Sequence, residues 1–324
     1  MKILVLGGTK FVGRATVEAA LERGHAVTLF NRGQTNPDLF PEAEQLRGDR
    51  TQDLSALDGR EWDAVVDPST SIPAVARASA EALRDRVGRY LFVSSISVYA
   101  DFSGSPTESS PRAELEDGQP DDELMLPGYE NYGALKALAE DAVRSVFGDR
   151  AVIVRPGLIV GPHDPTGRFT YWPHRIARGG EFVIPAPPES RQQFVDVRDL
   201  GDWMVELLER GASGAYNATS PGTTWTELVE SATRVCGSDA TPVWIDGDWL
   251  AEHGVGEWME LPLWLHDPDW AGMHRTDVSR AVDAGLTFRP LDDTVRGSLE
   301  QAATTDDAGL EPERERVLLE AWRA

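Results

Sequence analysis

The chain begins with an apolar strand pattern that runs directly into a glycine-rich turn. Residues 2–6 read Lys-Ile-Leu-Val-Leu, and a helical pattern follows the turn. Glycines allow a tight turn, and they let backbone amides approach a pyrophosphate at the N-terminus of a helix. A turn of this kind after an N-terminal strand therefore predicts a dinucleotide site. The residues expected to form it are Gly7, Gly8, Thr9, Lys10, Phe11, Val12 and Gly13.

Apolar strands alternate with amphipathic helices over the first half of the chain. The expected strands span residues 2–6, 26–30, 45–48, 64–67, 89–94 and 151–155, and the expected helices span 11–23, 74–86 and 131–146. Strands that are apolar almost throughout indicate a parallel sheet covered on both faces. The predicted fold class is therefore α/β, a doubly wound parallel Rossmann sheet with a smaller C-terminal substrate lobe.

The domain organisation follows from the point where this alternation stops. Residues 1–160 are expected to form the dinucleotide-binding domain, with residues of about 190–220 returning to it, and 161–324 mainly a substrate-binding lobe. Five of the ten tryptophans lie within 243–270. Such a cluster is typical of a core or a subunit contact, or of a ligand wall. Together with Phe169, Tyr171 and Trp172, it predicts a pocket for a sugar-like or partly apolar ring.

A second interruption is an acidic segment, residues 101–128, between two segments that carry candidate chemistry. It holds eight carboxylates together with several serines, prolines and glycines. We expect a long solvated excursion there, and its position makes it a candidate lid.

The charge balance excludes several classes of partner. The formal net charge of −23 repels nucleic-acid phosphates and anionic lipid surfaces, so a small-molecule substrate is expected. The longest apolar runs are far shorter than the ~18 residues of a membrane span. The apolar stretch after Met1 is too short for a secretory signal, which predicts a cytoplasmic protein. Cys236 is the only cysteine, and the six histidines lack ligand spacing, so no metal site is expected.

The end of the second strand is where the adenosine ribose of a dinucleotide is recognised. An acidic residue there accepts hydrogen bonds from both ribose hydroxyls, whereas a cation pairs with a 2′-phosphate. The chain has Asn31 and Arg32 at this position. This favours NADP over NAD, with NAD as the alternative if Arg32 is only a surface residue. Asp49, after the third strand, is placed to accept from the adenine amino group.

Tyr132 and Lys136 form the second candidate site. Residues at i and i+4 share one face of a helix, so the tyrosine hydroxyl and the lysine ammonium point into the same space. A nearby ammonium lowers the pKa of a tyrosine from its usual value near ~10 towards the working range. The chain has three lysines, Lys2, Lys10 and Lys136, which adds weight to the pair. Lys10, inside the glycine turn, is expected to contact a phosphate, unless it blocks close approach.

Ser95 lies at the carboxyl end of the fifth strand, the edge at which ligands of open α/β sheets bind. Its hydroxyl can hydrogen-bond a substrate oxygen while Tyr132 exchanges the proton. The alternative is that the serines here only cap a strand. The fourth strand ends through Asp67-Pro68-Ser69-Thr70, where Ser69 is placed to touch the cofactor.

Five segments, taken in order, resemble the short-chain dehydrogenase/reductase superfamily in its extended or atypical branch, often described as NAD-dependent epimerase/dehydratase proteins. They are GGTKFVG at 7–13, FVSSISVY at 92–99, YGALK at 132–136, RPGLIVGP at 155–162 and QFVDVRDLG at 193–201. The turn, written GGTxFxG, is similar to that of a subset that includes chloroplast stem-loop RNA-binding proteins and bacterial reductases.

The resemblance implies roles for individual residues. Tyr132 would exchange the proton, Lys136 would bind the nicotinamide ribose and lower the tyrosine pKa, and Ser95 would polarise the substrate oxygen. Pro156 and Gly157 would line the nicotinamide. The resemblance also implies a homodimer formed through the helix that carries Tyr132 and its neighbour.

Departures from the family pattern narrow the activity. Dehydratases of the family carry an acidic pair directly after the strand-five hydroxyl residue, and this chain has Ile96 and Ser97 there. Members that bind nucleotide sugars usually have an asparagine where this chain has Leu158. They also have an arginine where it has Gln192, although Arg175, Arg178 or Arg191 could compensate. Dehydration is therefore not expected, and a nucleotide-sugar substrate is disfavoured.

These observations predict an NAD(P)-dependent oxidoreductase or epimerase that transfers hydride at a secondary alcohol or ketone of a sugar-like or small-molecule substrate. A ketone that rotates before hydride returns gives epimerisation, and one that leaves gives net reduction or oxidation. Two alternatives stay open. One is a nucleotide-sugar epimerase, and the other is a non-catalytic dinucleotide-binding module with an RNA-binding or regulatory role.

Overall fold

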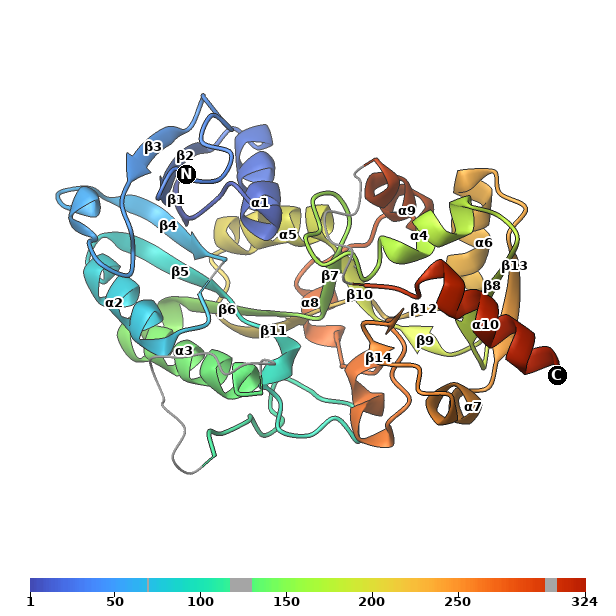
Figure 1. Cartoon of the computed structure of the whole chain (residues 1–324). Coiled ribbons are helices and arrows are strands. Elements are labelled where there is room, and N and C mark those ends of the chain that lie inside the picture. Colours follow the sequence, from blue (N-terminus) through green and yellow to red (C-terminus); the bar gives the residue numbers. More distant parts are fainter. Residues whose placement is uncertain (69, 117–129, 301–307) are drawn as a thin grey trace.

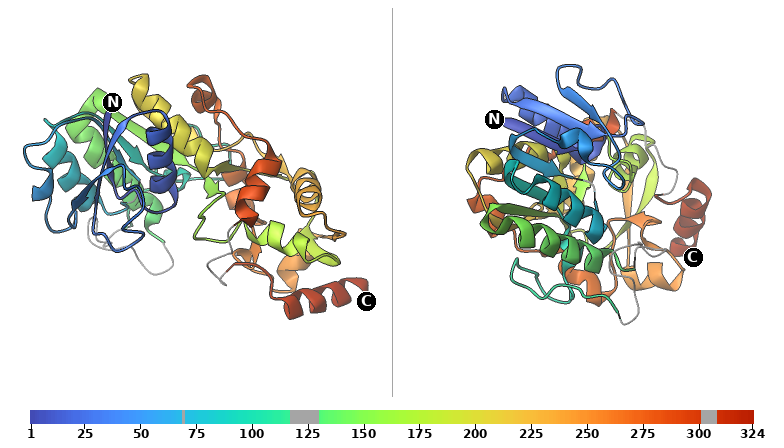
Figure 2. Two further views of the ribbon diagram at one scale, coloured as in Figure 1. Left: turned by 90° about the horizontal axis from the view of Figure 1, so that it is seen from above. Right: turned by 90° about the vertical axis from the view of Figure 1, so that its left-hand side faces the viewer.

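A computed structural model of the chain describes residues 1–68, 70–116, 130–300 and 308–324. Two lobes lie side by side (Figure 1). The N-terminal lobe contains a large sheet between helices, and the second lobe combines short strand pairs with helices. Figure 2 shows the C-terminal helix at the end of the second lobe that lies farthest from the N-terminus.

The described part of the chain contains a seven-stranded parallel sheet in the order β11-β6-β5-β4-β1-β2-β3. Its strands are β1 (Lys2–Leu6), β2 (Ala26–Asn31), β3 (Glu44–Arg47), β4 (Trp62–Asp67), β5 (Val87–Val93), β6 (Ala151–Pro156) and β11 (Gly214–Ala218). The order runs in both directions from β1, which is the doubly wound arrangement predicted from the sequence.

Helices cover both faces of the sheet, so its strands are apolar on both sides. On β1, Ile3 and Val5 face the core under α1 (Phe11–Glu22) and α5 (Val197–Glu209). Leu4 and Leu6 face the core under α2 (Pro73–Leu83) and α3 (Tyr132–Phe147). Short 3-10 turns join some of these elements, namely η1 (Ser55–Leu57), η2 (Ile96–Val98) and η4 (Gly148–Arg150). Helix α8 (Ser279–Asp283) packs beside β11.

The second lobe has a core of its own. Its strands pair as β7–β10, β12–β9, β13–β8 and β14–β15. They are β7 (Leu158–Val160), β8 (Glu181–Pro185), β9 (Arg191–Gln192), β10 (Phe194–Asp196), β12 (Thr223–Thr224), β13 (Thr241–Ile245), β14 (Glu257–Trp258) and β15 (Leu261–Pro262). Its helices are α4 (Tyr171–Ala177), α6 (Trp225–Cys236), α7 (Gly247–Glu252), η5 (Pro268–His274), α9 (Leu291–Leu299) and α10 (Pro312–Arg323).

The predicted strands of the first half all occur, with ends shifted by a residue or two. The larger shift is in α2, which was expected to reach residue 86 and ends at Leu83, its last buried residue. The expectation that Phe169 and Trp172 would line a pocket was wrong, because both side chains are 0% exposed. They fill the core of the second lobe, as large apolar side chains at helical spacing commonly do.

The acidic segment is anchored over its described part, residues 101–116. Arg112 donates to both carboxylate oxygens of Asp141 on α3, at 2.9 and 3.0 Å. The carbonyl of Phe102 accepts from Gly272 N, and the Phe102 ring stacks on Trp270. This part is therefore anchored to α3 and η5, while eight of its sixteen residues are exposed, as expected for a solvated excursion. Residues 117–128 of the candidate lid lie outside the described residues.

Among the residues that the structure describes, no helix is both long enough and apolar enough to cross a membrane.

Close backbone packing of α1 on α5 yields a first prediction. A Cβ atom on Gly201 of α5 would lie 2.8 Å from the carbonyl carbon of Ala15 and 2.9 Å from its oxygen. Alanine is the better helix former by about 1 kcal/mol, but overpacking costs about 1–3 kcal/mol. We therefore expect Gly201→Ala to lower the free energy of unfolding, measured by urea denaturation followed by circular dichroism.

The matched control is Gly104→Ala. A Cβ atom there meets nothing within 4 Å, so the free energy of unfolding should change by less than about 0.5 kcal/mol. A Gly201→Ala variant as stable as the wild type would show that the two helices can separate at no cost.

Candidate active site

A pocket of about 670 Å³ opens at the carboxyl ends of β1, β2 and β3. The glycine turn, the end of β2 and the segment after β3 line it together with residues that precede α2. It therefore brings together the following residues predicted to bind the cofactor: Gly7, Gly8, Thr9, Lys10, Phe11, Val12, Gly13, Asn31, Arg32 and Asp49. Ser69, also predicted there, lies outside the described residues.

At two positions of the glycine turn, Gly8 and Gly13, close packing leaves no room for a side chain. Gly8 has a φ of +93°, and a Cβ atom on it would lie 2.7 Å from Leu29 Cδ2. A Cβ atom on Gly13 would lie 3.0 Å from Gly8 N, so the first turn of α1 packs directly on the loop. Lys10, at the N-cap of α1, is exposed at the pocket. A helix N-terminus and an ammonium group at a tight turn suit a diphosphate.

Asn31 and Arg32 lie in the part of the pocket expected to hold the adenosine, and their contacts differ. The Asn31 amide donates to Gly7 O at 3.0 Å, and its oxygen accepts from Gly33 N at 2.9 Å. Asn31 therefore holds the turn, whereas Arg32 is exposed. Arg47, which the sequence analysis did not single out, also donates to Asn31 and lies against Gly33. The sequence feature that could have identified Arg47 is its position at the end of β3, the strand next to β2.

Asp49 is held in its ionised form. Its Oδ1 accepts from the Thr51 hydroxyl at 2.7 Å and from Thr51 N at 3.0 Å. These hydrogen bonds, with a contribution from the charge of Arg32, lower the pKa of Asp49. A carboxylate at this place can accept from an amino group of the adenine.

Lys136 is buried at the junction of three segments. It is 4% exposed, and its Nζ donates to Thr70 O at 2.7 Å and to Val93 O at 2.9 Å. The Phe92 ring centroid lies 5.0 Å from Nζ, and the Tyr132 ring centroid lies 5.9 Å from it. Burial lowers the pKa of Lys136 to about 8, although the charge of Asp67 opposes the shift. Lys136 Nζ therefore lies over the ring of Tyr132, one turn away on α3, and donates to two backbone carbonyls.

The turn that carries Ser95 packs closely against α3 at Gly133. The Ser95 hydroxyl accepts from Ser97 N at 3.1 Å and lies 3.0 Å from the Ser97 hydroxyl, which shapes the turn η2. A Cβ atom on Gly133 would overlap the carbonyl oxygen of Ser97. The glycine next to Tyr132 thus allows α3 to contact the turn that carries Ser95.

Gly157 approaches the same turn from β6. A Cβ atom on Gly157 would lie 2.8 Å from Thr219 Oγ1 and 3.6 Å from Ile96 Cδ1, next to Ser95. Pro156, the last residue of β6, is buried beside it. The two residues predicted to line the nicotinamide therefore lie at the carboxyl edge of the sheet, beside the turn of Ser95.

A buried ion pair lies behind Lys136 and was not predicted. Asp67, the last residue of β4, is 0% exposed and accepts two hydrogen bonds from Arg50, both of 2.6 Å. It also accepts from the Tyr90 hydroxyl at 2.8 Å. Although burial opposes ionisation, Arg50 lowers the pKa of Asp67. The signal in the sequence was a carboxylate that ends an otherwise apolar buried strand.

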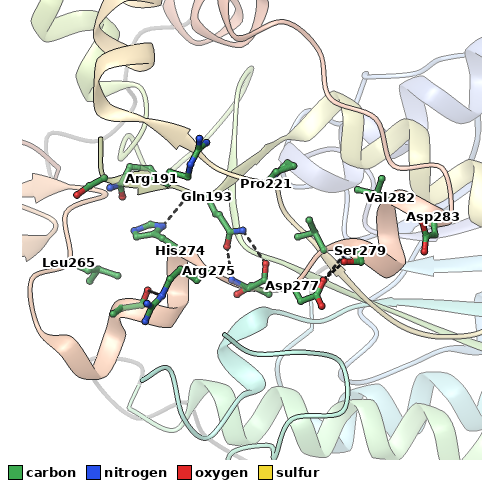
Figure 3. Close-up of a pocket in the computed structure, with 15 residues that line it drawn as sticks. Arg191, Gln193, Pro221, Leu265, His274, Arg275, Asp277, Ser279, Val282 and Asp283 are labelled. Atoms are coloured by element: carbon green, nitrogen blue, oxygen red, sulfur yellow. Dashed lines mark hydrogen bonds between the residues drawn. The ribbon is translucent and has the colours of Figure 1, made fainter. Parts of the chain in front are cut away.

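A second pocket, of about 910 Å³, lies where β9 meets η5 and α8 (Figure 3). Gln193 crosses it and exchanges hydrogen bonds of 3.0 and 2.8 Å with the backbone of Thr276. His274 Nδ1 accepts from Gln193 N at 3.1 Å, and burial lowers the pKa of His274 to about 4. Gln193 and the neutral side chain of His274 thus connect the residue after β9 with η5 and the segment that follows it.

The positions at which nucleotide-sugar enzymes hold a phosphate are filled differently here. Leu158 faces the core of the second lobe, and Gln192 is 5% exposed. Arg175 is buried in an ion pair with Glu315 at 2.6 Å and serves the structure of the lobe. Arg178 and Arg191 are exposed.

Within the described ranges, no group of three or more histidine, cysteine, aspartate or glutamate side chains could hold a metal ion.

The buried ammonium of Lys136 predicts a pH-dependent stability. Below pH 8, Lys136 binds its proton in both the folded and the unfolded chain. Between pH 8 and 10.5, the usual pKa of a lysine, mainly the unfolded chain holds the proton, so the free energy of unfolding rises with pH. The free energy of unfolding of the wild type minus that of Lys136→Met should rise by about 2 kcal/mol from pH 8 to 10.

Urea denaturation of both proteins without cofactor at several pH values measures this difference. Lys2→Met, which removes an exposed lysine, is the matched control and should give a flat difference. If the difference in free energy of unfolding between the wild type and Lys136→Met also does not change with pH, the buried ammonium would be contradicted.

The chain is similar to several known proteins. The chain is 27% identical over 267 residues to the 2′-dehydrokanamycin reductase of Streptomyces kanamyceticus, covering 78% of this chain and 71% of that protein. It is 25% identical over 241 residues to the chloroplast stem-loop binding protein of 41 kDa b of Arabidopsis thaliana, covering 67% and 58% of the two chains.

Among solved structures, the fold is similar to UDP-glucuronic acid 4-epimerase from Bacillus cereus in complex with NAD. The TM-score is 0.65 at 18% identity, over 93% of this chain and 98% of that chain. The family model for the NAD dependent epimerase/dehydratase family matches residues 3–219. The chain belongs to this family and is an NAD(P)-dependent enzyme of the short-chain dehydrogenase/reductase type.

Proposed function

We propose that the protein is an NADP-dependent oxidoreductase that interconverts a secondary alcohol and a ketone in a small, sugar-like substrate. The observation that carries this proposal is the buried Lys136 beside Tyr132, packed against the turn of Ser95. An ammonium, a tyrosine hydroxyl and a serine hydroxyl at one sheet edge are the groups that proton exchange at a carbonyl oxygen requires.

Each of these side chains has a separate role in the proposed reaction. The dinucleotide, held by the glycine turn, Arg32 and Asp49, supplies or accepts the hydride when it is bound. Tyr132 gives its hydroxyl proton to the substrate oxygen during reduction and takes it back during oxidation. Ser95 donates a hydrogen bond to the same oxygen. The ammonium of Lys136 stabilises the tyrosinate that remains, which lowers the pKa of Tyr132.

Two arginines support NADP as the preferred cofactor. Arg32 is exposed at the rim of the pocket, and Arg47 lies against the same turn. A pair of guanidinium groups suits a 2′-phosphate, which carries more charge than a ribose hydroxyl.

A ketone of moderate size, without a nucleotide, is the substrate favoured by the second lobe. The buried Leu158 and Gln192 supply no cation to a diphosphate. The relative from Streptomyces kanamyceticus is a reductase of a dehydrokanamycin, and we extend this type of reaction, reduction of a ring ketone, to the present chain. Epimerisation of a nucleotide sugar is the second candidate, supported by the fold of the UDP-glucuronic acid 4-epimerase.

The remaining features of the proposal follow from the sequence. Residues 1–160 with about 190–220 serve as the cofactor domain, and 161–324 serve mainly as the substrate lobe. The net charge of −23 disfavours RNA as a partner. We further propose a cytoplasmic location and a homodimer formed through α3 and the neighbouring α2.

Removal of the tyrosine hydroxyl tests the catalytic assignment. Tyr132→Phe should lower kcat for NADPH-dependent reduction of 2′-dehydrokanamycin by about 10²–10⁴-fold, because the proton donor is lost. The Kd of NADPH, measured by fluorescence titration, should stay within about twofold of the wild type.

The matched control is Tyr216→Phe on β11, which removes a hydroxyl that donates to the carbonyl of Ser213. The kcat of this variant should equal that of the wild type. Full activity of Tyr132→Phe would refute the mechanism. Tight binding of stem-loop RNA at physiological salt, without turnover of any ketone, would favour the non-catalytic alternative.

Arg32→Ala tests the cofactor preference. Loss of a charge-assisted hydrogen bond to the 2′-phosphate should raise the Kd of NADPH about ten- to a hundredfold. The Kd of NADH should change by less than about twofold, because NADH lacks that phosphate. Arg60→Ala, which removes an exposed arginine paired with Glu44, is the control. Equal weakening of both cofactors would contradict an NADP preference.

A further inference from the structure

Arg155, near the carboxyl end of β6, forms a buried ion pair with Glu140 on α3. Strand β6 lies between β5 and β11 in the sheet (Figure 1). Arg155 is 1% exposed and Glu140 is 0% exposed. Arg155 Nε donates to Glu140 Oε1 at 2.8 Å, and Nη2 donates to Oε2 at 2.7 Å, a bidentate arrangement that fixes direction as well as distance. The next two residues along the chain, Pro156 and Gly157, are those predicted to line the nicotinamide.

The third nitrogen of the Arg155 guanidinium reaches the segment that follows Ser95. Nη1 donates to the Tyr99 hydroxyl at 3.0 Å and to the carbonyl of Glu108 at 3.2 Å. The Tyr99 hydroxyl in turn donates to Asn217 Oδ1 on β11 at 2.5 Å. Arg155 therefore joins α3, the segment after β5 and β6 itself, and each of these carries a residue proposed to act in the reaction.

Glu140 lies on the helix face that carries the proposed catalytic pair. Tyr132, Lys136 and Glu140 are spaced four residues apart along α3, so each lies one turn from the next on the same face. Two further guanidinium groups face the Glu140 carboxylate, with Arg112 Nη1 at 3.4 Å and Arg144 Nη2 at 3.7 Å. Arginines of three segments therefore surround one buried carboxylate.

Glu140 acts on the charge of Lys136 from one turn away. Burial lowers the pKa of Lys136, the carboxylates of Asp67 and Glu140 oppose this shift, and the charge of Arg50 adds to it. Asp67 comes from β4 and Arg50 from the segment after β3, so Glu140 is the contribution of α3 itself. Without the Glu140 charge, the buried ammonium would be less stable.

A second buried ion pair shows what distinguishes the first. Arg175 Nε lies 2.6 Å from Glu315 Oε2, and both residues are buried in the second lobe. That pair joins α4 to α10, and neither helix carries a residue proposed to bind the cofactor or exchange the proton. Since a buried ion pair is often no more stabilising than apolar side chains of the same volume, the elements that it joins are the guide to its role.

We propose that Arg155 and Glu140 are positioning residues of the reaction. Arg155 holds the end of β6 and the segment after Ser95 in a fixed relation to Tyr132, and Glu140 supports the charge of Lys136. This inference rests on the proposed function and adds two residues that act through other side chains. Because hydride transfer is sensitive to small displacements of the reacting groups, loss of these contacts lowers the rate more than it weakens binding.

Lysine NMR tests Glu140 without any turnover. The chain has three lysines, so protein labelled with 13C at the lysine Cε gives three signals, and the signal missing from Lys136→Met identifies Lys136. A pH titration of the cofactor-free protein then measures its pKa. Glu140→Gln keeps an oxygen for Arg155 but removes the charge, so the pKa of Lys136 should fall by at least about 0.5 relative to the wild type. Glu315→Gln is the matched control and should leave that pKa unchanged.

Steady-state kinetics with 2′-dehydrokanamycin test Arg155. Arg155→Lys keeps the positive charge beside Glu140 but loses the planar fork, so it cannot hold all three segments at once. We expect kcat to fall about ten- to a hundredfold, with KM and the Kd of NADPH within about threefold of the wild type. Glu315→Gln should keep the kcat of the wild type. If Arg155→Lys does not fold, Tyr99→Phe removes the acceptor of Nη1 and should lower kcat about three- to tenfold with the same unchanged binding.

The outcomes separate this inference from the proposed function. An unchanged pKa of Lys136 in Glu140→Gln would overturn the role of Glu140, and a wild-type kcat in Arg155→Lys would overturn that of Arg155. An equal loss of kcat in Glu315→Gln would show that any buried ion pair has this effect, which would also overturn the inference. Retained turnover by Tyr132→Phe would instead overturn the proposed function, and the lysine titration would still test Glu140 because it needs no turnover.

Discussion

The buried ammonium of Lys136 is the interaction on which the reaction centre depends. Its two hydrogen bonds reach the carbonyl of Thr70, in the segment after β4, and that of Val93, at the end of β5. One side chain of α3 therefore fixes that helix against the carboxyl ends of two neighbouring strands. Because Tyr132 lies one turn earlier on the same helix face, the same bonds also hold the turn of α3 that carries it.

The chain accommodates this charge through the groups that surround it. Asp67 lies close enough to oppose the loss of the proton from Lys136, and Arg50 and Tyr90 hold Asp67 in place. Lys10 and Arg32 add positive charge at the rim of the pocket that the glycine turn lines. A protein of net charge −23 thus places cations at the pocket proposed to bind an anionic dinucleotide, so that the local charge there differs from the overall charge.

The sequence was sufficient to predict the sheet lobe because each of its parts has a local signal. Strands buried on both faces are apolar at every position, as in β1, and their separation by amphipathic helices indicates parallel pairing. The second lobe has no such signal. Strands β9 and β12 have two residues each, and their pairing depends on contacts between segments distant in the chain. Phe169 and Trp172 were consequently assigned to a pocket when they fill a core.

The same distinction holds inside the site. Tyr132 and Lys136 could be paired from the sequence because helical geometry relates residues four apart. Arg50 and Asp67 could not, because they lie 17 residues apart on different segments and meet only through the order of the strands. Asp67 at the end of an apolar strand is the local anomaly that would have drawn attention to the pair.

Recognition is the least predictable part, and the fold explains why. The side chains proposed to exchange the proton lie at positions that the sheet determines, so they occur in short motifs. The residues of the second lobe come from separate segments and meet through its packing. Since a loop outside the sheet can change without disturbing strand pairing, this is where one family can adapt to many substrates.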